Sequence, residues 1–384
     1  MIIRTLRPSS LGVLSVLLLV SCSHEVSPLT QVDTGAPDAG RPADDAGEEL
    51  ADILEVDEYP DAVADAGAPT DLGPRPDGGP QPDGGPQPDG GPQADGGPQP
   101  DASITADSGI DPTAPDEILF QEGLAAYNAL DYAGARAKFD QLWTMYPASR
   151  RHDNAGYLRG RCRYELADNA GAISTLLEMR STYPSSPFTS AAAYYTGRAR
   201  YRLLDYAGAL ADFRSAVIDL SGLYVDNAAY YVGRCEYELG DLAGAQTDLA
   251  AMETNYPAST YVDNARYYLG RAFYDARDYN GAVGPFGRVF QTPGSIYSDD
   301  ARYYLGRSKY ALGTLNTALV DFERLMTDSP TSQYADNSLY YEVRIHTDLN
   351  DCASARTQLN RLTSTFPAST LLPRAQTYLA QGGC

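Results

Sequence analysis

Few residues in this sequence are of the types that catalyse reactions or bind metals. Among its 384 residues are three histidines, His24, His152 and His346, and none has a second histidine or a cysteine pair at metal-site spacing. The glycines follow a long period and form neither a phosphate-binding loop nor a dinucleotide-binding motif. The sequence therefore predicts no catalytic site, no metal site and no cofactor, which indicates a protein that is not an enzyme.

Arginine, tyrosine and asparagine recur instead in sets whose members stand three or four residues apart. This spacing puts each set on one face of a helix. Arginine forms paired hydrogen bonds with carboxylates and tyrosine offers a stiff contact surface, and both are frequent where proteins bind one another. We therefore predict a ligand-binding face made up of Asn154, Tyr157, Arg161, Tyr164, Tyr194, Arg198, Tyr201, Asn227, Tyr230, Arg234, Tyr237, Asn264, Tyr267, Arg271, Tyr274, Tyr303, Arg307 and Tyr310.

The same residues have a second interpretation. The tyrosines and arginines could stack along the molecule without contacting a ligand, while the arginines pair with acids at Glu165, Glu238 or Asp275. The sequence leaves both hypotheses open.

A repeat of 36 or 37 residues positions these side chains in the region 116–384. Each unit is expected to contain two helices, with an aspartate at the start of each and a proline after the second in most units. A glycine recurs inside the first helix, where it costs about 1 kcal/mol relative to alanine. We expect this glycine and an alanine of the second helix to let two helices cross closely. The glycines are Gly123, Gly160, Gly197, Gly233, Gly270 and Gly306.

The pattern predicts an all-α solenoid of seven helix-turn-helix repeats and a closing helix. In the fifth repeat, Gly284 and Pro285 fall inside the second helix, so we expect a kink or a break there. The predicted aspartates at the starts of first helices are Asp116, Asp153, Asp226, Asp263, Asp299 and Asp336. The predicted repeats are 116–152, 153–189, 190–225, 226–262, 263–298, 299–335 and 336–372, and the closing helix is 373–384.

The repeat resembles the tetratricopeptide repeat, a unit of 34 residues, in Leu269-Gly270, Asp278-Tyr279, Ala282, Phe286 and the closing proline. Its tyrosine pair before the glycine and its Tyr-Pro-x-Ser ending look most like the exported bacterial subgroup. That subgroup includes the Tol-Pal-associated cell-division coordinator, which normally has a coiled coil that is absent here. It also includes the lipoprotein of the β-barrel assembly complex, which normally has fewer repeats and no long spacer. The resemblance implies a superhelix whose concave groove binds peptides, with the predicted arginine and tyrosine face lining that groove.

The first 22 residues have the charged start, apolar stretch and small-residue end of an export signal. The sequence Leu19-Val20-Ser21-Cys22 resembles the lipobox of bacterial lipoproteins, which implies a lipid on Cys22, and the following serine favours the outer membrane. An ordinary cleaved signal is the alternative. Residues 23–115 are rich in Pro, Gly, Asp and Ala and predict a disordered tether. Within it, Glu48–Tyr59 is either a transient helix or a short docking motif.

The net charge of -22 comes mainly from the predicted tether, because residues 25 to 111 hold 21 of the 51 acids. This charge argues against nucleic-acid binding, which needs a basic face.

Four cysteines remain beside Cys22. Cys162 and Cys235 occupy a small-residue position of the repeat and are expected to be packed thiols. Cys352 begins the second predicted helix of the seventh repeat, and Cys384 ends the closing helix that should lie beside it. An export compartment permits a disulfide between them.

These features together predict a non-enzymatic scaffold of the bacterial cell envelope that binds envelope proteins or peptides through its groove. Lipidated Cys22 would hold it at the outer membrane, facing the periplasm or the cell surface. The resemblance implies a role in outer-membrane assembly or in coordinating division and cell-wall synthesis. The alternative is a lipoprotein that binds peptidoglycan, with arginine and tyrosine holding the carboxylates of the stem peptides.

Overall fold

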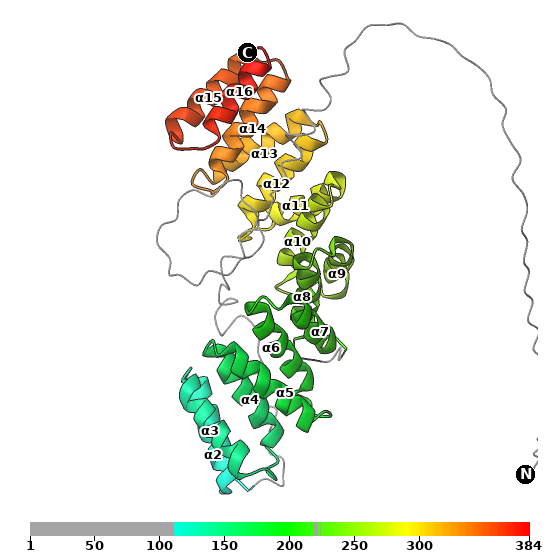
Figure 1. Ribbon diagram of the computed structural model, residues 1–384, viewed down its shortest axis with the longest axis vertical. Helices are drawn as coiled ribbons and strands as arrows, with labels where there is room; N and C mark the ends of the chain where they lie inside the picture. The colour runs from blue at the N-terminus through cyan, green and yellow to red at the C-terminus, as the bar shows by residue number, and fades with distance from the viewer. Residues whose placement is uncertain (1–110, 219–221, 223) are drawn as a thin grey trace, which may run out of the picture. The chain divides into compact units, whose positions relative to one another are not determined.

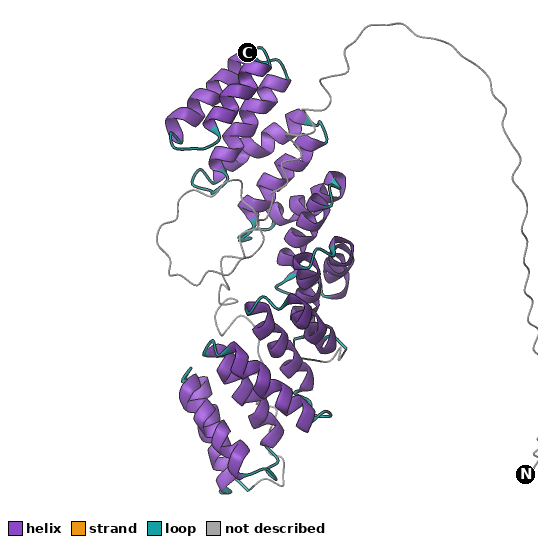
Figure 2. Cartoon of the chain, in the orientation of Figure 1, coloured by secondary structure: helices purple, strands orange, loops and turns teal. Residues whose placement is uncertain are grey.

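The computed structural model describes residues 111–218, 222 and 224–384. The predicted signal sequence with Cys22, residues 23–110 of the predicted tether and the segment Glu48–Tyr59 lie outside the described residues. The described part contains fifteen helices and no strand (Figure 1, Figure 2). This confirms the predicted all-α fold.

The helices form seven consecutive pairs followed by a closing helix. The first helices of the pairs are α2 (Pro115–Asn128), α4 (His152–Glu165), α6 (Thr189–Arg202), α8 (Val225–Glu238), α10 (Val262–Asp275), α12 (Ser298–Ala311) and α14 (Ala335–Asp348). The second helices are α3 (Tyr132–Met145), α5 (Asn169–Thr182), α7 (Tyr206–Ala216), α9 (Leu242–Asn255), α11 (Tyr279–Gln291), α13 (Leu315–Asp328) and α15 (Cys352–Thr365). The closing helix is α16 (Leu372–Gln381), which packs on α14 and α15. Each helix packs against the next, and first helices of adjacent pairs also touch, as α4 and α6 do, so the repeats stack in sequence order.

An aspartate caps every second helix except α13. Each accepts a hydrogen bond from the backbone amide three residues further on, at 2.8 to 3.1 Å, which confirms the capping expected from the sequence. These residues are Asp131, Asp168, Asp205, Asp241, Asp278 and Asp351. In α13 the position is taken by Thr314, whose side chain does not cap. In the fourth and sixth repeats the residue before the cap is a glycine with positive φ, Gly240 and Gly313, which allows the sharp turn between the helices.

The first helices begin differently from the prediction. Their N-cap residues make no side-chain capping bond, and the six predicted aspartates stand one residue inside each helix instead. A negative charge is still favourable there, next to the partial positive charge of the helix N-terminus. Some of these carboxylates are bound by a serine in the loop that ends the same repeat: Ser186 donates to Asp153, and Ser369 to Asp336, at 2.7 Å. The aspartate therefore ties the two ends of its repeat together.

In the first six repeats, the glycine of the first helix lies against a large side chain of the second helix in the same repeat. A β-carbon on Gly270 would lie 2.6 Å from the ring of Phe286, and one on Gly160 would lie 2.5 Å from Leu176. The expected close approach of two helices is confirmed, but the expectation that small residues face each other is wrong. The missing β-carbon makes room for a phenylalanine or a leucine.

Helix α11 contains Pro285 without the expected break, since it runs from Tyr279 to Gln291 with the proline buried inside it. A proline ring normally clashes with the β-carbon of the residue before it, and Gly284 has none.

Candidate functional site

Most of the predicted ligand-binding residues are buried. Thirteen of the eighteen are at most 8% exposed, namely Asn154, Tyr157, Arg161, Tyr164, Tyr194, Arg198, Asn227, Tyr230, Arg234, Tyr237, Tyr267, Arg271 and Tyr303. The other five, Tyr201, Asn264, Tyr274, Arg307 and Tyr310, are partly exposed. Most of this set is therefore covered by other parts of the chain, and its role in ligand binding stays a prediction.

The arginines of the set form a column with tyrosines from the following repeat. Each guanidinium lies over the ring of a tyrosine that stands two residues before the glycine position of the next unit. The pairs and their distances to the ring centre are Arg161 and Tyr195 (4.6 Å), Arg198 and Tyr231 (4.9 Å), Arg234 and Tyr268 (3.7 Å), Arg271 and Tyr304 (4.3 Å), and Arg307 and Tyr341 (5.7 Å). A cation over an aromatic ring contributes about 2 kcal/mol when both groups are removed from water. We call this set the arginine–tyrosine column.

The column continues into the closing helix, where Arg344 of α14 lies 4.4 Å from the ring centre of Tyr378 in α16. Helix α16 therefore occupies the place of the first helix of an eighth repeat. Its apolar contacts belong to a small core with the last pair of helices, in which Leu379 and Val343 are buried.

Three of these arginines also pair with a carboxylate four residues further along the same helix. Arg161 lies 3.5 Å from Glu165, Arg271 lies 3.5 Å from Asp275, and Arg234 pairs with Glu238. Stacking plus ion pairing is the arrangement that the second hypothesis described, and these three arginines already have carboxylate partners within the chain.

In four of the five tyrosine pairs, the first tyrosine stacks on an aromatic N-cap residue of the next first helix. Tyr267 and Tyr297 have ring centres 4.4 Å apart and planes within 8° of parallel, and Tyr303 and Tyr334 are 4.3 Å apart. The aromatic residue therefore replaces a capping side chain at the start of the helix and joins two repeats.

Burial raises the pKa of Tyr231 in the column, and of Tyr267 and Tyr303 next to the column, well above the ordinary value of 10. These three hydroxyls therefore remain neutral at physiological pH.

One aromatic cluster, around His152, was not expected from the sequence. The imidazole is the first residue of α4, is 4% exposed and stacks on Trp143 with ring centres 3.9 Å apart. In the tautomer with the proton on Nε2, this nitrogen donates to the Trp143 carbonyl at 2.9 Å. The other ring nitrogen, Nδ1, then accepts a hydrogen bond from the Tyr183 hydroxyl at 2.6 Å. Both ring nitrogens serve packing, and the described residues contain no group of side chains that could hold a metal ion.

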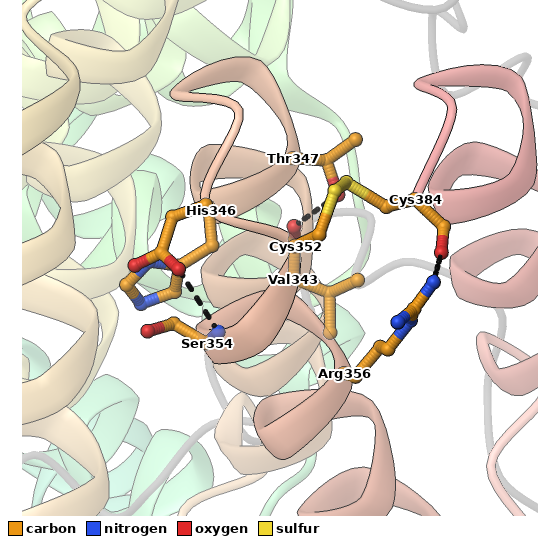
Figure 3. Close-up of a disulfide and its surroundings, with 8 residues drawn as sticks. Val343, His346, Thr347, Cys352, Ser354, Arg356 and Cys384 are labelled. Atoms are coloured by element: carbon orange, nitrogen blue, oxygen red, sulfur yellow. Dashed lines mark hydrogen bonds and ion pairs between the residues drawn. A yellow bond between two sulfur atoms is a disulfide. The ribbon is translucent and has the colours of Figure 1, made fainter.

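Cys352 and Cys384 are joined by a disulfide, with their Cα atoms 5.0 Å apart. Figure 3 shows that this bond links the start of α15 to the end of the segment after α16, where Arg356 also donates to the Cys384 carbonyl. Cys162 and Cys235 are free and buried, as expected for packed thiols, and burial raises the pKa of Cys162 to about 12.

An ordered stack of two-helix repeats, with glycine in the first helix and aspartate before the second, defines a helical-repeat protein built to present a surface. The tetratricopeptide-repeat model matches residues 117–149 and 154–186, and the model described as outer membrane lipoprotein matches residues 224–340. The chain is a tetratricopeptide-repeat protein with a domain similar to that of the YfiO outer membrane lipoproteins.

Two solved structures agree on the fold. The C-terminal part of a repeat-containing protein from Cytophaga hutchinsonii has a TM-score of 0.54 at 19% identity, over 67% of this chain and 98% of that chain. The apo form of RapI has a TM-score of 0.50 at 11% identity, over 68% of this chain and 79% of that chain. No curated protein matches the sequence. Within the described residues, no helix combines the length and the apolar character needed to cross a membrane.

Proposed function

We propose that this protein is a non-enzymatic scaffold that binds other proteins in the bacterial cell envelope, where a lipid on Cys22 holds it at the outer membrane. The observation that carries the proposal is the match of residues 224–340 to the outer membrane lipoprotein model, within a continuous stack of tetratricopeptide repeats. Proteins with this fold supply a rigid surface on which other proteins can bind.

The partner-binding surface of this proposal lies at the C-terminal ends of the first helices. Three residues of the predicted binding face, Tyr201, Tyr274 and Tyr310, keep part of their surface accessible there. The peptidoglycan alternative depended on free guanidinium groups. Arg234 and Arg271 are at most 4% exposed and already paired, so this alternative has no observation in its favour.

The anchor is tested by fractionating envelopes from cells that express the full chain or Cys22→Ser. We expect the full chain to sediment with outer membranes and to incorporate a labelled fatty acid, and the variant to lose both properties. Equal fractionation and labelling of the two proteins would remove the lipid anchor from the proposal.

The cellular process in which the scaffold acts is tested by depleting the protein from the bacterium that makes it. A role in outer-membrane assembly predicts loss of folded β-barrel proteins, and a role in division predicts chains of unseparated cells. A depleted culture with normal barrel proteins, normal separation and no cross-linked envelope protein would overturn the scaffold proposal.

A further inference from the structure

One edge of the array exposes a leucine at the same place in five of the seven repeats. The residue directly after the first helix is Leu166, Leu203, Leu239, Leu312 or Leu349, and each is between 40% and 51% exposed. The first and fifth repeats have Ala129 and Ala276 there. We call the five leucines the leucine edge.

Contacts between neighbouring helix ends show that these leucines follow one another along a single side. The guanidinium of Arg202 at the end of α6 donates to the Tyr164 carbonyl near the end of α4 at 3.2 Å. The Tyr310 hydroxyl near the end of α12 donates to Asp348 at the end of α14 at 2.8 Å. Each of these residues lies one or two positions before an exposed leucine, so the leucines of consecutive repeats are neighbours.

The fold does not require apolar side chains on this edge. Leu130 and Leu204, in the turns of the first and third repeats, are 57% and 68% exposed and have φ of 62° and 61°. A left-handed conformation costs a leucine about 1–2 kcal/mol. The fourth and sixth repeats use Gly240 and Gly313 at the same position. Ala167, Arg277 and Asn350 take the same left-handed conformation in the other three repeats, so the turn itself requires no leucine. The exposure of leucines at this edge therefore points to a use outside the folded chain.

Carboxylates flank the leucine edge on both sides. Glu165, Glu238 and Asp348 immediately precede a leucine, and the capping aspartates follow two residues after it. Glu165 and Glu238 are paired with arginines of the column, and Arg163 and Arg200 pair with the capping aspartates of their own repeats. Arg202, Arg277 and Lys309 add further positive charges, of which Lys309 pairs with Asp321 of α13. The capping aspartates of the first, fourth and fifth repeats, Asp131, Asp241 and Asp278, accept backbone amides and form no ion pair within the described residues. The edge is therefore apolar along its length, and the negative charge beside it that no ion pair neutralises lies at these three capping aspartates.

We propose that the leucine edge binds a segment of a partner protein that combines apolar residues with lysine or arginine, such as a basic amphipathic helix. The leucines would be covered by the apolar residues, and the cations would face the capping aspartates. This inference rests on the proposed scaffold function and names the chemistry of its partner.

The test uses the purified full chain and two synthetic helical peptides of equal length, one of leucine and lysine and one of leucine and glutamate. We expect the lysine peptide to bind and the glutamate peptide not to bind, by fluorescence anisotropy. The double variant L203S/L239S should weaken the binding of the lysine peptide about tenfold, because two half-exposed leucines no longer contribute apolar area. The variant D241N/D278N should weaken it as well and flatten its salt dependence, while asparagine keeps both helix caps.

The matched controls are Leu177→Ser on α5 and Ile296→Ser in the loop between α11 and α12, since both residues are exposed apolar side chains away from the edge. They should bind the lysine peptide as tightly as the unchanged chain, and circular dichroism should show equal helix content in all variants. Equal binding of the two peptides, no binding of either, or edge variants that bind like the controls would each overturn the inference. Binding to phosphatidylcholine vesicles that only the edge variants lose would also overturn it and assign the edge to lipid.

Cross-linking in cells separates this inference from the scaffold proposal. If the L203S/L239S chain captures the same envelope proteins as the unchanged chain, the leucine edge is not the binding surface, but the scaffold function stands. If neither chain captures any, the scaffold proposal itself fails.

Discussion

Replacing Glu342 with glutamine should stabilise the protein in a pH-dependent way. This carboxylate of α14 is fully buried, and neither oxygen has a hydrogen-bond partner. The nearest cation is Arg361 of α15, at 3.9 Å, and the negative charge of Glu323 on α13 faces the same region. Burial raises the pKa of Glu342 from 4.5 to about 7, so the folded protein holds this proton more tightly than the unfolded chain.

The sign of the effect follows from linkage. The contribution of Glu342 to stability is fully present below pH 4.5, where its carboxyl is neutral in both states, and it is lost as the pH rises to about 7. A difference of about 2.5 pKa units corresponds to about 3 kcal/mol above that range. Glutamine removes the charge and leaves a buried amide, so we expect Glu342→Gln to gain about 2 kcal/mol near pH 8 and almost nothing near pH 4.5.

Hydrogen exchange of the α14 amides measures this local free energy directly, and urea unfolding gives the value for the whole array. Glu323→Gln is the control on the neighbouring helix, and its side chain is exposed, so its effect should stay below about 0.5 kcal/mol. A gain of the same size at both pH values, or a loss of stability near pH 8, would refute the burial argument.

Three further substitutions test the fold. Gly270→Ala should lower the free energy of unfolding by about 1–3 kcal/mol in urea titrations, because its β-carbon would meet a phenylalanine ring at 2.6 Å. The control Gly287→Ala in α11 has open space around the new β-carbon and should raise the free energy of unfolding by about 1 kcal/mol. Equal effects of the two substitutions would contradict the packing. Arg277→Gly should gain about 1 kcal/mol, because this residue has a φ of 60°, and a loss would show that the left-handed turn is not strained. Replacing Cys352 and Cys384 with serine should lower the stability of the C-terminal helices by about 3 kcal/mol, measured by hydrogen exchange, and unchanged exchange would mean that the disulfide adds nothing there.

Local features of the fold could be predicted because they depend on residues close in sequence. The capping role of Asp278 follows from its own turn, and the need for glycine at Gly270 follows from a partner sixteen residues away in the same repeat. The starts of the first helices could not be predicted in the same way. Asp153 is bound by Ser186 at the far end of its repeat. The N-cap position of α6 is filled by Phe188, which packs on Tyr157 of the preceding repeat.

The candidate site shows a different limit. Spacing correctly put Tyr267 and Arg271 on one face of a helix, but spacing does not tell whether the next repeat covers that face. One feature of the sequence indicates that the next repeat covers this face. The second tyrosine of each pair, such as Tyr304, recurs with the same period as the arginine. A residue that recurs in step with a cation is a candidate partner for it in the adjacent repeat, and here Arg271 lies over that ring at 4.3 Å.

The burial of the column also determines how binding can be tested. Arg234 is 1% exposed, lies over Tyr268 and pairs with Glu238, so substituting it removes contacts worth several kcal/mol between two repeats. A partner lost with that substitution would report a damaged array as readily as a lost contact. Leu239 stands five residues further on and is 47% exposed, so serine there removes much less packing inside the chain than a change at Arg234. If the contact lies on the edge, a chain substituted at Arg234 should still bind the partner in proportion to its folded fraction. A chain substituted at Leu239 should be fully folded and should not bind. This pair of results would locate the contact on the edge and not in the column.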